Sequence, residues 1–136
     1  MEILKSAHVG IGKIDVELID RVNIFQASRL AMEEALRQLG AEPDFLLIDG
    51  HVPVQTPHPK QFIIHGDARS LSIACASIVA KVTRDRLMVK YDRKYPEYGF
   101  LRHKGYATEE HLAALKKYGA SPIHRKTFRP VFLMSL

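Results

Sequence analysis

Two short apolar runs, Phe45-Leu-Leu-Ile-Asp-Gly50 and Gln61-Phe-Ile-Ile-His-Gly-Asp67, decide the fold class. Continuous apolar runs of this length, each stopped by turn residues, are typical of strands that are buried on both faces of a sheet. A proline-rich segment between the runs predicts an irregular loop. From Ser70 or Ser72 we expect a long helix that runs to about Tyr95, where a proline ends it.

The N-terminal segment adds a strand and two helices to this prediction. His8-Val-Gly-Ile-Gly-Lys-Ile14 alternates apolar and other residues, which predicts a strand with one buried face. Asp15 is expected to cap a short helix through Asp20, and Asn23 to cap a second helix that ends at Gly40. Strands that alternate with helices indicate the α/β class. Three strands are few for such a sheet, so we expect N-terminal strands to be missing.

The long helix is expected to change character along its length. Its first half, Ile73-Ala-Cys-Ala-Ser-Ile-Val-Ala80, is apolar nearly all round and has small side chains, which predicts burial close against the sheet. Its second half, Arg84-Asp-Arg-Leu-Met-Val-Lys90, becomes amphipathic and basic. Residues 96–107 predict a loop, and Thr108 then caps a last helix that ends at Gly119.

Composition excludes several classes of protein. A chain of 136 residues with 46% apolar residues suits one domain, which we expect to cover residues 1–136. The longest uncharged apolar stretch, Leu71 to Ala80, is far shorter than the ~20 residues of a membrane span. No secretory leader is visible, and a single cysteine, Cys75, indicates a reducing compartment, so we expect a cytoplasmic protein. Secreted mini-proteins, membrane proteins and fibrous proteins are excluded.

Positive charge is concentrated in the second half of the chain. Residues 1–83 have a net charge of −2 and residues 84–129 one of +7, which together give the overall +5. A basic half of this kind favours a phosphate-rich partner. A basic surface that binds nothing is about as compatible with the composition.

Asp49 and Asp67 are the candidate catalytic residues. Each follows a short apolar strand and stands next to a glycine, and ligands of open α/β sheets gather beyond the strand ends. Two carboxylates that meet there are the hard oxygen ligands that Mg²⁺ or Mn²⁺ prefers. The alternative is structural, because Asp-Gly and Gly-Asp are common in turns and Asp67 could cap the following helix.

Other catalytic motifs are absent from the sequence. None of the seven histidines has zinc-ligand spacing, and His65 is expected to be a polar residue at a strand end. There is no phosphate-binding Gly-x-x-x-x-Gly-Lys loop and no Gly-x-Ser-x-Gly elbow. Cys75 lies among small apolar residues, which indicates a buried, inert thiol.

Two basic segments are candidates for binding nucleic acid. Tyr98-Gly-Phe-Leu-Arg-His-Lys-Gly-Tyr106 mixes aromatic rings, which can stack on sugars or bases, with cations that can hold phosphates. Ser121-Pro-Ile-His-Arg-Lys126 adds positive charge near a turn. Aromatic residues in loops also serve as hydrophobic anchors, and the second segment could be an exposed connection.

The chain resembles the ribonuclease HII family over about residues 8–130. The motifs that carry the resemblance occur in unbroken order along the chain: Asn23-Ile-Phe-Gln-Ala27, Leu47-Ile-Asp-Gly50, Gly66-Asp67, Ser72-Ile-Ala-Cys-Ala-Ser-Ile-Val-Ala-Lys-Val-Thr-Arg-Asp85, Tyr95-Pro-Glu-Tyr-Gly-Phe, His103-Lys-Gly-Tyr106 and Ser121-Pro-Ile-His-Arg125. Several linked motifs make the resemblance specific.

The resemblance implies a ribonuclease H-like fold, a mixed sheet flanked by helices, and cleavage of the RNA strand of RNA–DNA hybrids. It also implies nicking of duplex DNA on the 5′ side of single ribonucleotides, as in ribonucleotide excision. Four acids hold Mn²⁺ or Mg²⁺ in the family, and the resemblance places two of them on Asp49 and Asp67. It implies that Tyr106 packs against the sugar at the scissile junction. The remaining substrate contacts that it suggests are Lys81, Arg84, Lys104 and Arg125.

One family motif is not in this sequence. Ribonuclease HII has an N-terminal strand that ends in Asp-Glu-x-Gly-Arg-Gly, which supplies the other two acids and recognises the ribose 2′-hydroxyl, and residues 1–136 contain no such motif. We therefore expect a partial ribonuclease HII-like domain that is weak or inactive alone. The alternatives are one half of a split enzyme, whose partner chain supplies the missing strands, and a non-catalytic nucleic-acid-binding module. Exposed sheet edges would make the chain marginally stable or prone to associate.

Overall fold

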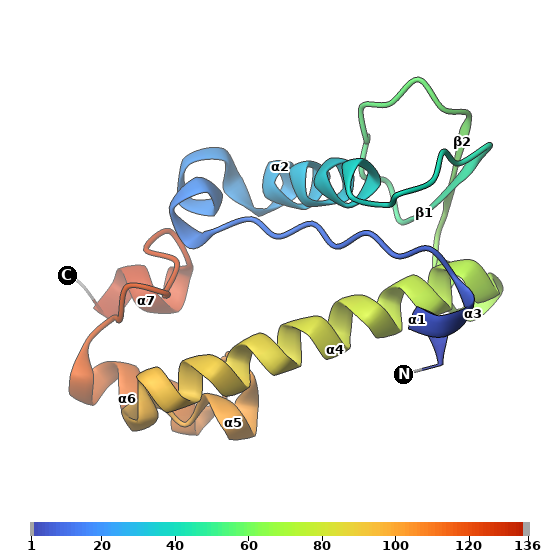
Figure 1. The fold of residues 1–136 in the computed structure, drawn as a ribbon. Helices are drawn as coiled ribbons and strands as arrows, with labels where there is room; N and C mark the ends of the chain where they lie inside the picture. Colours follow the sequence, from blue (N-terminus) through green and yellow to red (C-terminus); the bar gives the residue numbers. More distant parts are fainter. Residues whose placement is uncertain (1, 135–136) are drawn as a thin grey trace. The chain divides into compact units, whose positions relative to one another are not determined.

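The computed structural model describes residues 2–134. By their internal contacts these residues form two compact units, which divide between Ala80 and Lys81, and each is described by itself. Figure 1 shows the order of the elements along the chain, from α1 (Ile3–Ser6) to α7 (Arg129–Met134). The expectation of a single domain over residues 1–136 stays a prediction.

The sheet of the first unit is a parallel pair of strands. β1 (Leu46–Asp49) and β2 (Lys60–Ile63) pair in a register that places Leu46 opposite Lys60 and Asp49 opposite Ile63. Both strands were predicted, although β2 ends two residues early because His65 has a left-handed backbone (φ 53°). The expected burial on both faces is wrong, because Ile48 is the one buried residue of the two strands and a pair of strands has little to cover it. The parallel pair and the helices around it confirm the α/β class; within residues 2–134 the sheet contains no antiparallel strand.

The first unit also contains the predicted pair of capped helices, which run on as α2 (Val16–Arg37) with a kink between them. The Asp15 carboxylate accepts a hydrogen bond from the Leu18 amide at 2.8 Å, and the Asn23 side chain accepts one from the Gln26 amide at 3.1 Å. Asn23 has φ 71°, which produces the kink. Both predicted caps are therefore confirmed, and the helix ends three residues before Gly40.

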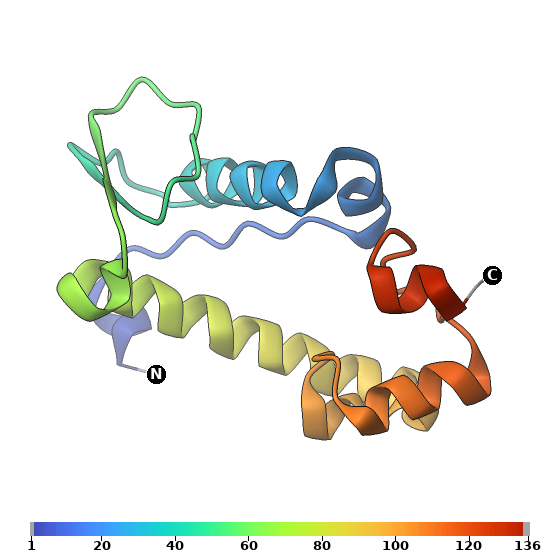
Figure 2. The same ribbon diagram turned by 180° about the vertical axis from the view of Figure 1, so that it is seen from behind.

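Residues 8–14 do not form the strand that alternation predicted. They are extended but pair with no strand, and they run along α2 in both views (Figures 1 and 2). A Cβ atom added at Gly10 would lie 1.9 Å from the Ala35 carbonyl oxygen, and one at Gly12 would lie 1.8 Å from that of Ala31. The alternating glycines thus let the backbone approach a helix, which explains why the pattern resembled that of a strand.

Two helices follow β2: the short α3 (Gly66–Arg69) and the predicted long helix α4 (Leu71–Lys94). The expected all-round burial of residues 73–80 is wrong, because only Ile73 and Val79 are buried and Ile78 is 49% exposed. Small apolar side chains favour close packing but do not provide the element that covers them, and the other residues of this stretch are half-buried or exposed. Cys75 is half-buried.

The second unit has its own apolar core, formed by Tyr98, Phe100, Ala114, Leu115 and Val131. Residues 96–107 are not a plain loop, because they contain the 3₁₀ turn η1 (Pro96–Tyr98) and the short helix α5 (Phe100–His103). Phe100, 1% exposed, anchors this segment.

The last predicted helix is present as α6 (Glu109–Tyr118). The Thr108 hydroxyl accepts a hydrogen bond from the His111 amide at 3.3 Å, and Gly119 ends the helix, as predicted. No helix within residues 2–134 is long and apolar enough to cross a bilayer.

Candidate functional site

The carboxyl end of the β1–β2 pair brings the two candidate acids to one edge of the sheet. Asp49 is the last residue of β1, and Asp67 lies in α3, just beyond the end of β2. Oδ1 of Asp49 accepts a hydrogen bond from the amide of Gly66, the residue before Asp67, at 2.8 Å. The two acids therefore stand on adjoining segments, as the sequence predicted.

Gly66 makes this approach possible, and the sequence argument gave it no role of its own. It is buried, and a Cβ atom there would lie 2.5 Å from Cδ1 of Ile73 and 3.2 Å from Oδ1 of Asp49. A larger residue would therefore require the side chains of Ile73 and Asp49 to move. The signal in the sequence is the Gly-Asp pair, for which a turn was the structural alternative.

Asp67 lies inside α3 and is not its N-cap, which is His65, so it does not cap this helix as the structural alternative predicted. Its Oδ1 accepts a hydrogen bond from the Ala68 amide at 3.0 Å within the first turn of α3. Both Asp49 and Asp67 are exposed to solvent, and so is His65, which makes no side-chain capping bond to α3. One hydrogen bond uses only part of a carboxylate, which offers about four lone-pair sites.

The donor chemistry of this edge fits a divalent cation, but the number of donors does not complete a site. Asp49 and Asp67 provide hard oxygen ligands of the kind that Mg²⁺ and Mn²⁺ prefer. Among the described residues, no three or more His, Cys, Asp or Glu side chains are grouped so that they could hold a metal ion. The two acids could therefore hold a cation only together with further ligands.

Within the second unit, the structure joins Tyr106 to Arg84. The Tyr106 side chain is 59% exposed, and the Arg84 guanidinium carbon lies 4.7 Å from its ring centroid. Lys104 and Gly105 both have left-handed backbones, with φ 50° and φ 80°, and this turn projects Tyr106 outward. A cation over an exposed aromatic ring suits a site for a sugar and its phosphate.

The three other predicted substrate contacts have partners of their own. Lys81 forms an ion pair with Asp85 at 3.0 Å, and Lys104 donates to the carbonyl of Leu101. The Arg125 guanidinium lies 4.7 Å from the ring centroid of Phe128. None of these three contacts involves Arg84 or Tyr106, so the grouping of Lys81, Lys104 and Arg125 with them stays a prediction.

Three buried histidines of the second unit were missed by the sequence argument. His103, His111 and His124 are 6%, 6% and 8% exposed. Burial, together with the nearby His111, lowers the pKa of His124 to about 4, and burial lowers the pKa of His111. One signal was available, because His111 shares a helix face with Ala114 and Leu115, and that face is the buried one.

Comparison with known proteins assigns the chain to a family. A profile of the family described as Ribonuclease HII matches residues 2–133. The chain belongs to the ribonuclease HII family. The ribonuclease HII of Coxiella burnetii is 53% identical over 126 residues, which are 93% of this chain and 62% of that protein. Those of Leuconostoc mesenteroides and Enterococcus faecalis are 52% and 54% identical over 95% and 90% of the chain.

A solved structure confirms the ribonuclease H-like fold. The crystal structure of ribonuclease H2 from Pyrococcus horikoshii matches with a TM-score of 0.69 at 24% identity, over 89% of this chain and 65% of that one. This ribonuclease HII chain spans between 48% and 62% of the length of the curated relatives named above. The family resemblance is thus confirmed, while the roles of individual residues stay predictions.

Proposed function

We propose that this chain contributes half of the active site of a metal-dependent ribonuclease HII. The complete enzyme would hydrolyse the RNA strand of RNA–DNA hybrids and nick duplex DNA 5′ to single ribonucleotides. The hydrogen bond from the Gly66 amide to Asp49 carries this proposal, because it holds the two candidate metal ligands at one edge of the sheet. Membership of the ribonuclease HII family supplies the reaction class.

The reaction explains why two acids are needed at this edge. Water attacks a phosphodiester that is already negative, and Mg²⁺ or Mn²⁺, when bound, lowers the barrier by activating the water and stabilising the leaving oxygen. Asp49 and Asp67 would be the ligands that this chain supplies. The Gly66 amide fixes the orientation of the Asp49 carboxylate, so the ligand needs no reorganisation when a cation arrives.

The second unit would hold the nucleic acid. Tyr106 offers an exposed ring that can pack against the sugar beside the scissile bond, and Arg84, next to this ring, can contact the adjoining phosphate. Lys81, Lys104 and Arg125 would add phosphate contacts. The net charge of +7 over residues 84–129 supports this role.

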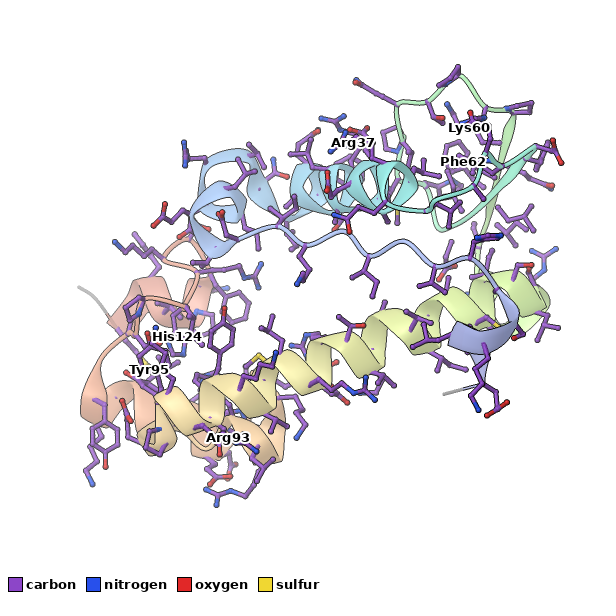
Figure 3. The ribbon with its side chains drawn as sticks, in the orientation of Figure 1. Arg37, Lys60, Phe62, Arg93, Tyr95 and His124 are labelled. Atoms are coloured by element: carbon purple, nitrogen blue, oxygen red, sulfur yellow. The ribbon has the colours of Figure 1, made fainter. Side chains whose placement is uncertain are left out.

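Apolar side chains are exposed on the sheet, which supports the proposal that a further segment covers them. Phe45, Leu47, Phe62 and Ile64 are between 37% and 53% exposed on or beside the two strands. Figure 3 shows Phe62 and Lys60 on β2. Two strands alone are at best marginally stable in water, so additional strands should cover this surface. We propose that a segment with the Asp-Glu-x-Gly-Arg-Gly motif, in the same polypeptide or another, adds these strands and the remaining acids.

Without that segment, the chain should bind nucleic acid but cleave it weakly or not at all. A non-catalytic binding module is the second candidate function, and the basic charge of the second unit favours it. The single cysteine supports action in a reducing compartment such as the cytoplasm.

The test is a cleavage assay on duplex DNA that carries one ribonucleotide, with Mn²⁺ and with or without a polypeptide that bears the missing segment. We expect nicking when the segment is added, and its loss in Asp49→Asn. Asp44→Asn, an exposed aspartate just before β1, is the matched control and should keep the activity. Equal nicking by the Asp49→Asn protein would refute the assignment of Asp49. Salt-sensitive binding without nicking under either condition would favour the binding module.

A further inference from the structure

The three buried histidines of the second unit form hydrogen bonds that determine their tautomers. Nδ1 of His111 contacts the carbonyl oxygen of Tyr106 at 2.9 Å, and a carbonyl can only accept, so this nitrogen carries the proton. Nε2 of a neutral His111 is then an acceptor, and it lies 3.0 Å from Nε2 of His124, which must donate. Nδ1 of His124 in turn accepts from the Ser121 amide at 3.0 Å.

The result is a one-directional chain of donors. It runs from the amide of Ser121 through the ring of His124 and the ring of His111 to the carbonyl of Tyr106. The Ser121 hydroxyl, 2.8 Å from Nδ1 of His124, can only donate to that nitrogen as well. Each ring nitrogen of the two histidines has a partner when both rings are neutral.

The same network holds the backbone on the other side of Tyr106. The Tyr106 amide donates to the carbonyl of His103 at 2.9 Å, and the Gly105 amide donates to Nδ1 of His103 at 3.2 Å. His103 stacks on His111 with ring centroids 4.4 Å apart. The backbone of Tyr106 is thus held at its amide by the carbonyl of His103, and at its carbonyl by the His111 ring and the Thr108 amide.

Packing alone does not account for these histidines. Apolar side chains of similar volume would fill the core without desolvating polar rings, whose burial is unfavourable unless every polar atom is paired. The paired atoms of His111 and His124 end at the carbonyl of Tyr106, the residue that the proposed function places against the sugar, whereas Nε2 of His103 pairs with the carbonyl of Tyr98 at 2.8 Å. Positions away from Tyr106, such as Ala114 and Leu115, are occupied by apolar residues.

We propose that His111 and His124 are positioning residues, which hold Tyr106 in the orientation that packs against the substrate sugar. This inference rests on the proposed function. Neither histidine touches the substrate in this account; both act through the Tyr106 carbonyl.

The chain of donors requires neutral histidines, and its surroundings keep them neutral. His124 faces Tyr98 of η1, with ring centroids 4.9 Å apart, and His111 of α6; Tyr98 is neutral near pH 7, since burial raises its pKa. The His124 ring also packs near Phe100 of α5, an apolar residue, with ring centroids 5.6 Å apart. Figure 3 labels His124 in this unit. A proton added to Nδ1 of His124 would face the Ser121 amide hydrogen and break the chain.

The first test reads the tautomers directly by ¹⁵N NMR of the 136-residue protein near neutral pH. We expect His111 to be protonated at Nδ1 and His124 at Nε2. The opposite tautomer at His111 would overturn the proposal, because its ring could not then donate to Tyr106. This measurement needs no variant and no activity.

The second test measures affinity for an RNA–DNA hybrid duplex by fluorescence anisotropy at low salt, without divalent metal. Loss of one stacked aromatic ring should weaken binding about tenfold, which we expect for Tyr106→Ala. His111→Leu removes the donor and should weaken binding to a similar extent. His111→Asn, whose amide can replace Nδ1 as donor, should restore most of the affinity. The exposed His8→Gln is the matched control and should bind like the unaltered chain.

The outcomes separate the two proposals. The double variant Tyr106→Ala/His111→Leu should bind no more weakly than Tyr106→Ala, because both changes act on one contact. If Tyr106→Ala weakens binding and a folded His111→Leu protein does not, the positioning role alone is refuted. If Tyr106→Ala binds like the unaltered chain, the substrate role of Tyr106 in the proposed function is refuted. Equal losses in His111→Leu and His111→Asn would also overturn the positioning role.

Discussion

Acidification should destabilise the second unit through His124. Burial and the neighbouring His111 lower the pKa of His124 from an ordinary 6.5 to about 4 in the folded state. The unfolded chain therefore binds a proton more readily than the folded chain does. The free energy of unfolding falls as the pH decreases from 6.5 to about 4. Above pH 6.5 the neutral His124 causes no loss of stability.

The size of this effect follows from the difference between the two pKa values. At about 1.4 kcal/mol per pH unit, the free energy of unfolding should decrease by about 3 kcal/mol over that range from His124 alone. Burial lowers the pKa of His111 as well, so its contribution has the same sign. The assay is urea unfolding followed by circular dichroism at several pH values between about 7 and 4.

The control is the His124→Gln protein, compared by the slope of unfolding free energy against pH. Carboxylates also titrate in acid, but chiefly below about pH 5, and they are the same in both proteins. The slope between about pH 6.5 and 5 should therefore be clearly smaller in His124→Gln. Equal slopes in the two proteins would show that His124 is not held neutral by burial, and would refute the reasoning.

Three further predictions test the fold and the site. Gly66→Ala should lower the free energy of unfolding by about 1 kcal/mol, because its Cβ would lie 2.5 Å from Cδ1 of Ile73 and 3.2 Å from Oδ1 of Asp49, so both side chains must move. Thermal unfolding measures the loss, and unchanged stability would contradict these contacts. Asn23→Ala should lower the free energy of unfolding by about 1–2 kcal/mol, because alanine loses the capping hydrogen bond and must still adopt φ 71°. Asn23→Gly should lower it less, because glycine accepts that φ. The reverse order in urea unfolding would contradict the role of Asn23 in the kink. Arg84→Gln should reduce the slope of log affinity for duplex against log salt by about one, because one phosphate contact is lost. The matched control is Arg37→Gln, whose arginine is paired with Glu34, and it should leave the slope unchanged. Equal slopes in the two variants would exclude a phosphate contact at Arg84.

Local signals in the sequence were enough to predict most helices and strands. The caps at Asp15, Asn23 and Thr108 act within three residues, and each makes the predicted hydrogen bond. The apolar run before Asp49 predicted β1, because the Asp-Gly turn residues mark where the strand ends. The family motifs also predicted the ribonuclease HII assignment.

The predictions failed where the structure of a segment depends on the element that it packs against. Alternation in residues 8–14 cannot distinguish pairing with a strand from packing along a helix, and the close approach of Gly10 to Ala35 shows the second case. The burial of residues 73–80 was overestimated because the apolar character of a helix does not determine which other elements cover it.

The positions of the candidate site residues could be predicted only where they follow from neighbouring strands. Asp49 and Asp67 follow neighbouring strands, so the parallel pairing brings them to one edge. The histidine network could not be predicted from spacing, because His103, His111 and His124 come from separate elements and meet only in the folded unit.

Manganese-induced broadening of amide NMR signals tests the central claim most directly. Mn²⁺ held by Asp49 and Asp67 should broaden the amides of nearby Gly50 and Gly66 first. The exposed amide of Asp44, before β1, should be affected only at higher concentration. The effect should be lost in Asp49→Asn and kept in Asp44→Asn. Broadening that is uniform along the chain, or equal in the Asp49→Asn protein, would contradict a metal site at this edge of the sheet.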